Sequence, residues 1–145
     1  MKETIDYHIK ATWHGISRMY NQLASKHDMS QAIGFVLINI DKEQGTPATK
    51  IAPLMGMEAT SLTRLLKSME SNGLIERIKD EQDGRMMRVC LTKEGLQKRK
   101  IAKRVIGKFN DEVLKTVSEN DIAIFFEVMG KINSSIEKFK KIETV

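Results

Sequence analysis

The sequence predicts a mainly α-helical fold that contains one small β-hairpin. Apolar residues recur at three- and four-residue steps along most of the 145 residues, which is the period of an α-helix. Only two prolines occur, so few helices are interrupted from within. Between residues 74 and 91 the period changes to two, and a turn sequence rich in Asp divides this stretch into two strands.

The composition is typical of one domain with a packed core, with or without an added dimerisation element. Hydrophobic residues make up 41% and charged residues 30% of the chain, which excludes global disorder. The net charge of +5 permits a polyanionic partner without requiring one. The single cysteine excludes an internal disulfide, and no apolar run approaches the ~20 residues that span a bilayer. With its polar N-terminus, the chain is therefore expected to be cytoplasmic, with no membrane segment.

The first helix is expected from about residue 5 to residue 25. Its apolar side runs through Ile9, Trp13, Ile16, Tyr20 and Leu23. The aromatic residues of this stripe, Trp13 and Tyr20, are most simply core or dimer-interface residues. The wall of a small-molecule pocket is an alternative use of the same side chains.

A second helix is expected from Ser30, a good N-cap, to about Lys42. Its buried face consists of Ile33, Val36, Leu37 and Ile40. Gly45 follows as the expected C-terminal glycine.

Thr46 is then expected to cap a third helix that has Pro47 as its first residue. Pro53 removes the bond to the carbonyl of Thr49 and should kink or shorten this helix. Residues 55–57 form a tight connection that contains a glycine. A short helix, a three-residue turn with glycine and a second helix together form the helix-turn-helix pattern.

The fourth helix, residues 57–72, has two chemically different faces. Its apolar face is formed by Leu62, Leu65, Leu66 and Met69, and its polar face by Thr60, Thr63, Arg64, Lys67 and Ser71. Gly73 is the expected stop, with Leu74 packing back onto Met69. A helix in a DNA major groove needs such hydroxyls and cations, although an ordinary solvated surface helix has the same pattern.

A β-hairpin directly after a helix-turn-helix forms a wing. Its strands are expected at residues 74–79 and 85–91, joined by a turn in which Asp83 and Gly84 supply positive φ. Arg85 at the tip fits a narrow minor groove, whereas the neighbouring acidic residues favour a merely solvated tip. We expect Asp83 to orient Arg85 through a fork-shaped pair.

Two further helices complete the chain. Thr92 is the expected N-cap of a long helix, which carries six cations and no acid between residues 98 and 108 and is most simply solvated there. Ser118 is expected to cap the last helix. The wide apolar stripe of that helix, together with the first helix, indicates a partner chain: Ile122, Phe125, Phe126, Met129, Ile132, Ile136 and Phe139.

The order of these elements and four residue blocks resemble the MarR family of bacterial winged-helix regulators. The blocks are Thr63–Leu66, Met69–Arg77, Asp80–Arg85 and Leu91–Gly95. The resemblance covers essentially the whole chain, and the middle of the chain is its most diagnostic part. It implies one MarR-like domain over residues 1–145, with a winged helix-turn-helix lobe at about 30–95 and helical dimerisation regions at about 1–28 and 96–145.

The resemblance further implies a homodimer that binds double-stranded DNA. Two recognition helices would enter successive major grooves of a pseudo-palindromic operator, and the wings would enter the minor groove. Such proteins usually repress genes near their own and release DNA when a small ligand binds. We therefore expect a ligand-responsive, homodimeric repressor.

The resemblance assigns DNA-binding residues to three elements. Five lie on the outer face of the recognition helix: Thr60, Ser61, Thr63, Arg64 and Lys67. The other four, near phosphates or at the wing tip, are Thr46, Thr49, Asp83 and Arg85. A pocket for a small-molecule effector is expected to be walled by Trp13, His14, Ile16, Tyr20 and Met55.

Two departures from known members of the family concern the signal. Peroxide-sensing members use a cysteine in the first helix, whereas Cys90 lies in a wing strand and is expected to act as a small buried hydrophobe. The three histidines are scattered without the spacing of metal ligands. Thiol-based peroxide sensing and zinc sensing are therefore disfavoured, and no cofactor or metal is expected.

Two other classes of protein are compared with this expectation. A winged helix used only as a protein-interaction module fits the acidic wing turn and the modest net charge. An enzyme is not expected, because the sequence shows no Ser-His-acid set, no phosphate-binding glycine loop and no paired carboxylates in a cleft.

Overall fold

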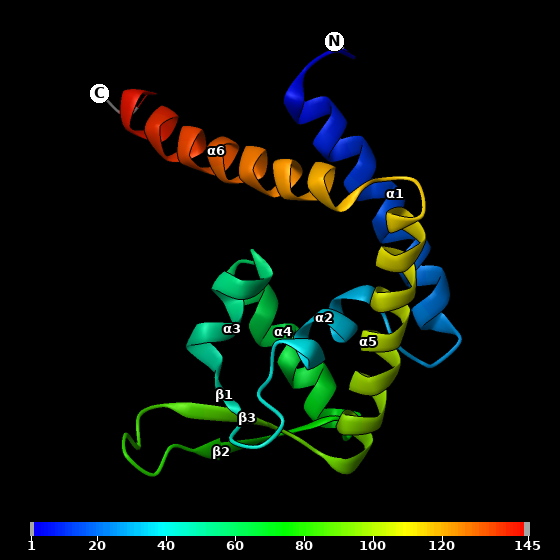
Figure 1. Ribbon diagram of the computed structural model, residues 1–145. Coiled ribbons are helices and arrows are strands. Elements are labelled where there is room, and N and C mark those ends of the chain that lie inside the picture. The colour runs from blue at the N-terminus through cyan, green and yellow to red at the C-terminus, as the bar shows by residue number, and fades with distance from the viewer. Residues whose placement is uncertain (1, 144–145) are drawn as a thin grey trace. The chain divides into compact units, whose positions relative to one another are not determined.

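The computed structural model describes residues 2–143, within which it contains six α-helices and a three-stranded antiparallel sheet (Figure 1). The chain divides into two compact units, Met1–Val105 and Ile106–Val145. The first unit contains all three strands and the hydrophobic core. The expected class, mainly α with a small β wing, is confirmed.

The first helix, α1, spans Ile5–Ser25, as the sequence predicted. It begins after Thr4, whose hydroxyl accepts the backbone N–H of Tyr7 at 3.4 Å. The second helix, α2, spans Gln31–Ile38, and the hydroxyl of its N-cap Ser30 accepts the N–H of Ile33 at 3.2 Å.

The prediction that α2 continues to Lys42 was wrong, because a local turn ends it four residues earlier. The Asp41 carboxylate accepts the backbone N–H groups of Glu43 and Gln44 at 2.9 and 2.8 Å. An Asp side chain that bonds the backbone two and three residues on competes with the helical ladder. Gly45 therefore lies at the end of this turn, with φ of 71°, and not at the helix terminus.

The expected helix start at Thr46 and Pro47 was also wrong. These two residues form strand β1, Thr46–Pro47, which pairs with strand β3 through Thr46 opposite Val89. The Thr46 hydroxyl accepts the N–H of Asp41 at 2.9 Å and caps no helix. A proline is tolerated here because β1 is a short edge strand.

The helix-turn-helix consists of α3, Ala48–Met55, and α4, Ala59–Ser71. Helix α3 continues through Pro53 and ends two residues later, where Gly56 adopts φ of 61°. Helix α4 begins two residues later than predicted, after Glu58, which makes no side-chain bond to its first turn.

The end of α4 confirms the predicted glycine stop. Gly73 has φ of 73°, and its N–H bonds the carbonyl of Glu70 at 3.1 Å. The N–H of Leu74 bonds the carbonyl of Met69 at 3.0 Å, so the chain reverses over the apolar side of the helix.

The wing is formed by strands β2, Ile75–Lys79, and β3, Met87–Leu91, in the sheet order β1-β3-β2. Ile75 lies opposite Leu91, and Lys79 opposite Met87. The prediction of positive φ at Gly84 was wrong; the loop instead contains a bond from the N–H of Met86 to the carbonyl of Asp83 at 2.9 Å. A loop of this length distributes the chain reversal over several residues.

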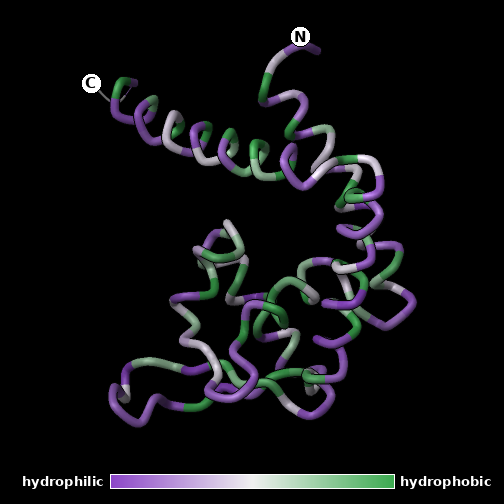
Figure 2. The backbone as a smooth tube through the Cα atoms, viewed as in Figure 1, coloured by the Kyte–Doolittle hydropathy of each residue, from purple (hydrophilic) through white to green (hydrophobic). Residues whose placement is uncertain are grey.

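The core lies where α2, α3, α4 and the sheet meet. Its most deeply buried side chains are Val36, Leu37, Ile40, Ile51, Leu66, Met69, Ile75 and Val89. Figure 2 shows hydrophobic stretches in the segments of this lobe, while the wing loop is mostly hydrophilic. The apolar face predicted for α4 is thus the face that holds it to the protein.

Helix α5, Lys93–Leu114, is joined tightly to the end of α4. The Thr92 hydroxyl accepts the N–H of Gly95 at 3.0 Å, which confirms the predicted N-cap, and donates to the carbonyl of Gly73 at 2.6 Å. A Cβ at Gly95 would overlap the carbonyl oxygen of Leu74, so only glycine allows this approach.

Helix α6, Glu119–Glu143, starts after Ser118, whose hydroxyl accepts the N–H of Asp121 at 3.1 Å. None of its described residues is buried. Its exposed large apolar side chains are Ile124, Phe125, Phe126, Val128, Ile136, Phe139 and Ile142. Within residues 2–143, no helix has both the length and the apolar character that a bilayer crossing requires.

Candidate nucleic-acid interface

The two faces of α4 are separated as the sequence predicted. Leu62, Leu66 and Met69 are at most 3% exposed. The five residues expected at the DNA are all exposed on the other side: Thr60, Ser61, Thr63, Arg64 and Lys67. The apolar face holds the helix against the lobe, and the polar face is open to a partner.

Thr63 differs from the other residues of this face in its hydrogen bonding. Its hydroxyl donates to the carbonyl of Ala59 at 2.9 Å, one turn earlier in the same helix. The hydroxyl proton is therefore used within α4. Toward a base or a sugar, Thr63 in this rotamer offers only an acceptor and a methyl group.

The two threonines expected near phosphates occupy different environments. Thr49 is exposed in the first turn of α3. Thr46 is half-buried, and its oxygen already accepts the N–H of Asp41. Its hydroxyl proton is the part of the side chain that could still reach an anion.

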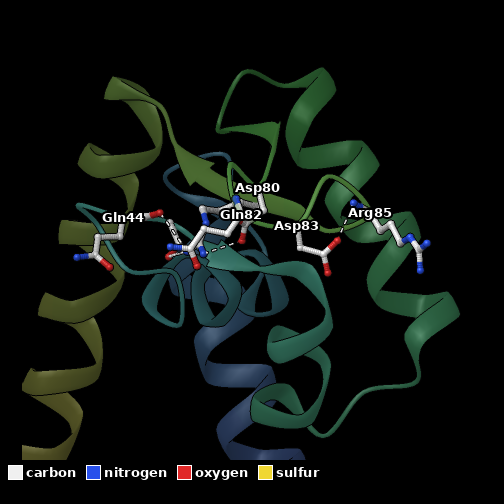
Figure 3. A network of polar contacts seen from close by, with 7 residues as sticks. Gln44, Asp80, Gln82, Asp83 and Arg85 are labelled. Atoms are coloured by element: carbon white, nitrogen blue, oxygen red, sulfur yellow. Dashed lines mark hydrogen bonds and ion pairs between the residues drawn. The ribbon is translucent and has the colours of Figure 1, made fainter.

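At the wing tip, the expected fork-shaped pair of Asp83 with Arg85 was wrong. The Asp83 carboxylate accepts the backbone N–H of Arg85 at 3.0 Å. Figure 3 shows the Arg85 guanidinium directed away from that carboxylate. An aspartate that bonds the N–H two residues ahead forms a local turn, and this geometry leaves the arginine side chain extended from an exposed loop.

The base of the wing holds a polar network that the sequence analysis missed. The Arg88 guanidinium contacts the Asp80 carboxylate at 3.1 Å and donates to the carbonyls of Gln44 and Gly45, each at 3.3 Å. The residues of this network that Figure 3 labels lie around the start of the wing loop. No local pattern identifies the Gln44 and Gly45 carbonyls as partners of Arg88, because they lie more than 40 residues away in the sequence.

Hydrogen bonds lower the pKa of two carboxyl groups near this network. The pKa of Asp80 lies below its ordinary value mainly because of the N–H of Gln82, and then because of the Arg88 side chain. The pKa of Asp41 is lowered by the N–H groups of Gln44 and Glu43. Both carboxyl groups are thus held in the ionised form that the turns require.

The residues expected to wall an effector pocket are brought together only in part. The Trp13 and Tyr20 rings pack on Phe35, with centroid distances of 6.4 and 5.9 Å. Tyr20 is buried, which raises the pKa of its phenol, whereas Trp13 is 46% exposed. Phe35 on α2 was missed, because its contacts with the rings of α1 join two helices and no local pattern contains them.

The remaining residues expected at the pocket differ in exposure. His14 is exposed, and Ile16 and Met55 are half-buried. The Asn39 amide donates to the carbonyl of Phe35 at 2.8 Å and lies 3.6 Å from the Met55 sulfur. Through Asn39, Met55 is therefore linked to Phe35, the residue of α2 on which the Trp13 and Tyr20 rings pack.

The basic run of α5 is not uniformly solvated. The Lys98 ammonium donates to the carbonyl of His27, and Arg99 is half-buried. The exposed cations of the run are Lys100, Lys103, Arg104 and Lys108. Within residues 2–143, no three His, Cys, Asp or Glu side chains gather in a way that could hold a metal ion.

The chain has a helix-turn-helix followed by a β wing, and the second helix of the helix-turn-helix, α4, exposes cations. This arrangement defines the class of winged-helix proteins. A sequence model of the MarR family matches residues 29–87, which include α2, the helix-turn-helix and the wing loop. This part of the chain is thus similar to the MarR family.

The chain is also similar to curated transcriptional regulators. The HTH-type transcriptional regulator TtmR of Methylorubrum extorquens (strain PA1) is 29% identical over 87 residues, or 60% of this chain and 45% of that protein. The HTH-type transcriptional regulator BilQ of Clostridium symbiosum (strain WAL-14163) is 22% identical over 94% of this chain and 95% of its own length. The chain spans about half the length of the first three curated relatives it matches.

The fold is shared with solved structures. The crystal structure of an S. aureus MepR–DNA complex superposes with a TM-score of 0.83, over 91% of this chain and 98% of that one. At 22% identity, this likeness establishes the common fold.

Proposed function

We propose that this chain is a sequence-specific DNA-binding transcriptional regulator that acts as a homodimer in the bacterial cytoplasm. The observation that carries the proposal is α4, which buries Leu62 and Leu66 and exposes Arg64, Lys67 and several hydroxyl residues. Cations and hydroxyls are the groups that reach base edges and phosphates in a major groove. The names of the relatives, TtmR and BilQ, are those of HTH-type transcriptional regulators.

In this proposal each element of the interface has its own part. Arg64 reads base edges from the centre of the exposed face of α4, and Lys67 binds phosphate. Thr49 and Thr46 lie near the adjoining phosphates of the DNA backbone, and Arg85 enters the minor groove from the wing. Asp83 supports Arg85 by shaping the turn that presents it, through the bond to its backbone N–H.

The exposed apolar side chains of α6, and those of the first helix, support the proposed homodimer. Phe126 and Phe139 are 66% and 62% exposed, which is costly for a monomer in water. A two-fold axis would place two copies of α4 in successive major grooves, at half-sites roughly 34–36 Å apart. The operator is accordingly a pseudo-palindrome.

We further propose that a small ligand controls this dimer as a repressor. Trp13, Tyr20 and Phe35 offer an aromatic wall that is partly open, with Met55 of α3 attached to the same region. The dimer would have two states, which differ in the spacing of its recognition helices. A ligand bound there releases DNA only if it binds more tightly to the state whose spacing does not fit the operator.

The test is selection of bound fragments from the source genome, followed by titration of the selected fragment. Arg64→Ala should weaken specific binding by ~1–3 kcal/mol and relax the base preference at one position of each half-site. Lys138→Ala, which removes an exposed cation on α6, is the control and should leave the preference intact. Undiminished discrimination by Arg64→Ala would refute the reading role of this residue.

A protein-interaction module without DNA binding remains the alternative, because the wing loop carries Asp80, Glu81 and Asp83. The same titration distinguishes the two functions. A chain that retains no genomic fragment at moderate salt would favour the interaction module.

A further inference from the structure

We propose that Arg88 is a positioning residue for DNA binding, which holds the wing loop on the segment that leads into the helix-turn-helix. Its partners are the Asp80 carboxylate on one side and the carbonyls of Gln44 and Gly45 on the other. These four residues are called the wing anchor. The inference rests on the proposed function, since it concerns how the wing is presented to DNA.

The Arg88 guanidinium joins two parts of the chain that are distant in sequence. Its Nη2 lies 3.1 Å from Oδ2 of Asp80, at the start of the wing loop. Its Nη1 donates to the carbonyls of Gln44 and Gly45 at 3.3 Å each. A planar guanidinium with several fixed donors can make such a bridge, whereas an ammonium point charge lacks that fixed geometry.

The carbonyl side of the wing anchor is preorganised. Asp41 fixes the turn through the N–H groups of Glu43 and Gln44, and the N–H of Gly45 bonds the Asp41 carbonyl at 3.0 Å. Gly45 lies so close to β3 that a Cβ would be 2.6 Å from the Cys90 sulfur. Arg88 therefore bonds a segment that has little freedom to move away.

The acidic side of the wing anchor organises the wing loop itself. Asp80 accepts the N–H of Gln82 at 2.9 Å through Oδ1, while Oδ2 contacts Arg88. Its own N–H bonds the carbonyl of Met86 at 2.9 Å, across the other end of the loop. Asp80 thus connects the anchor to both ends of the loop that carries Arg85.

The burial of Arg88 and Asp80 indicates that this pair supports the wing and does not contact phosphate directly. The side chains of Arg88 and Asp80 are 31% and 11% exposed, and Arg88 already donates to three acceptors. The exposed cation of the wing loop is Arg85. Arg88 would therefore act on DNA affinity through the placement of Arg85.

This role makes a prediction opposite in sign to simple electrostatics. DNA is a polyanion, so replacing a carboxylate near it by a neutral amide should strengthen binding. If Asp80 is part of the wing anchor, Asp80→Asn should instead weaken binding, by roughly tenfold, because a charge-assisted bond to Arg88 is lost. Glu81→Gln removes a neighbouring exposed carboxylate and is the matched control, which should bind at least as tightly as the wild type.

The experiment measures the affinity of the full chain for a genomic fragment selected by the wild type. Asp80→Asn and Arg88→Lys should both weaken binding by roughly tenfold; a phosphate contact by Arg88 would be preserved by lysine. In an Arg85→Ala background, Asp80→Asn should cost less than about twofold, because the anchor acts through Arg85. Amide exchange at Gln82 and Met86 should quicken in Arg88→Lys, while exchange in the core stays slow.

Three outcomes would overturn the inference alone: Asp80→Asn that binds as tightly as Glu81→Gln, full activity of Arg88→Lys, or equal effects of Asp80→Asn with and without Arg85. Each presupposes that the wild type binds the fragment. Loss of all DNA binding by the wild-type chain would instead overturn the proposed function, and this inference with it.

Discussion

Single residues of this chain do work that their residue type alone does not indicate. Thr46 was expected to cap a helix, but its hydroxyl holds a turn through Asp41. Asp83 was expected to bind a guanidinium, but it bonds a backbone N–H. In both cases a side chain found a backbone partner within five residues, and such local bonds are available before any distant partner is in place.

The Asp80 carboxyl group offers a titration that tests the wing anchor. Because its folded-state pKa is lowered below 3.8, ionised Asp80 stabilises the fold above about pH 4, and this contribution is lost as the pH falls through the folded value. The charged or polar groups acting on it are the N–H of Gln82, the Arg88 guanidinium and the N–H of Asp83. Carbon-detected NMR should give a midpoint below 3.8.

Arg88→Met should raise that midpoint without restoring it fully, since the N–H of Gln82 is the larger cause and remains. Glu81→Gln serves as the reference for a simple change of nearby charge. A midpoint in Arg88→Met identical to that of the wild type would remove Arg88 from the account of Asp80.

At the scale of elements, the sequence predicted several boundaries that are set by short-range signals, although it missed the local Asp41 turn that follows α2. The start of α5 at Thr92 and the glycine stop after α4 depend on residues within one helical turn of the boundary. The end of α2 and strand β1 were missed. β1 exists because Thr46 and Pro47 pair with Val89 and Arg88 about 40 residues later, and no local pattern contains that register.

The candidate site divides in the same way. The exposed face of α4 could be predicted, because helical period alone separates Arg64 and Lys67 from the leucines. The wing anchor could not be predicted from the sequence, because Arg88 meets the Gln44 and Gly45 carbonyls only in the folded protein. Phe35 was missed for the same reason, since its contact with Trp13 joins two helices.

Two glycines of α5 should respond oppositely to the same substitution. Gly95→Ala places a Cβ onto the Leu74 carbonyl, so the start of the helix must shift, at a cost of roughly 1–3 kcal/mol. Gly107→Ala meets no atom within 4 Å and should stabilise the helix by about 0.5–1 kcal/mol. Urea unfolding at a fixed protein concentration measures both.

Equal effects of the two substitutions would show that helix propensity alone decides them. The close approach of α5 to the end of α4 would then have no energetic consequence. Opposite signs would place the constraint at Gly95, where α5 meets the Leu74 carbonyl.

At the scale of the whole molecule, the exposed apolar surface concerns assembly. The 145-residue chain exposes Phe125, Phe126 and Phe139 on one helix. An exposed apolar surface of this kind is typical of a protein–protein interface. In the proposed dimer these side chains are covered by the second copy. In that proposal the affinity for DNA depends on the protein concentration as well as on the contacts with DNA.

Phe125→Glu should therefore shift the protein toward monomer in analytical ultracentrifugation, because it places a charge on the apolar side of α6. The same variant should lose affinity for a two-half-site fragment much more than for a single half-site. Lys138→Glu makes a larger change of charge at another exposed position of α6 and should leave the assembly intact. An unchanged sedimentation coefficient for Phe125→Glu would place the dimer interface elsewhere.

The hydroxyl of Thr92 has a mechanical consequence for the proposed binding of α4 to DNA. It bonds the Gly73 carbonyl just after α4 and the Gly95 amide in the first turn of α5, and Gly95 itself touches the Leu74 carbonyl. Two helices fastened at one such joint cannot tilt independently there. A movement of the first turns of α5 would therefore be passed to the end of α4, and Thr92 adds to the apolar contacts that fix the angle of this helix.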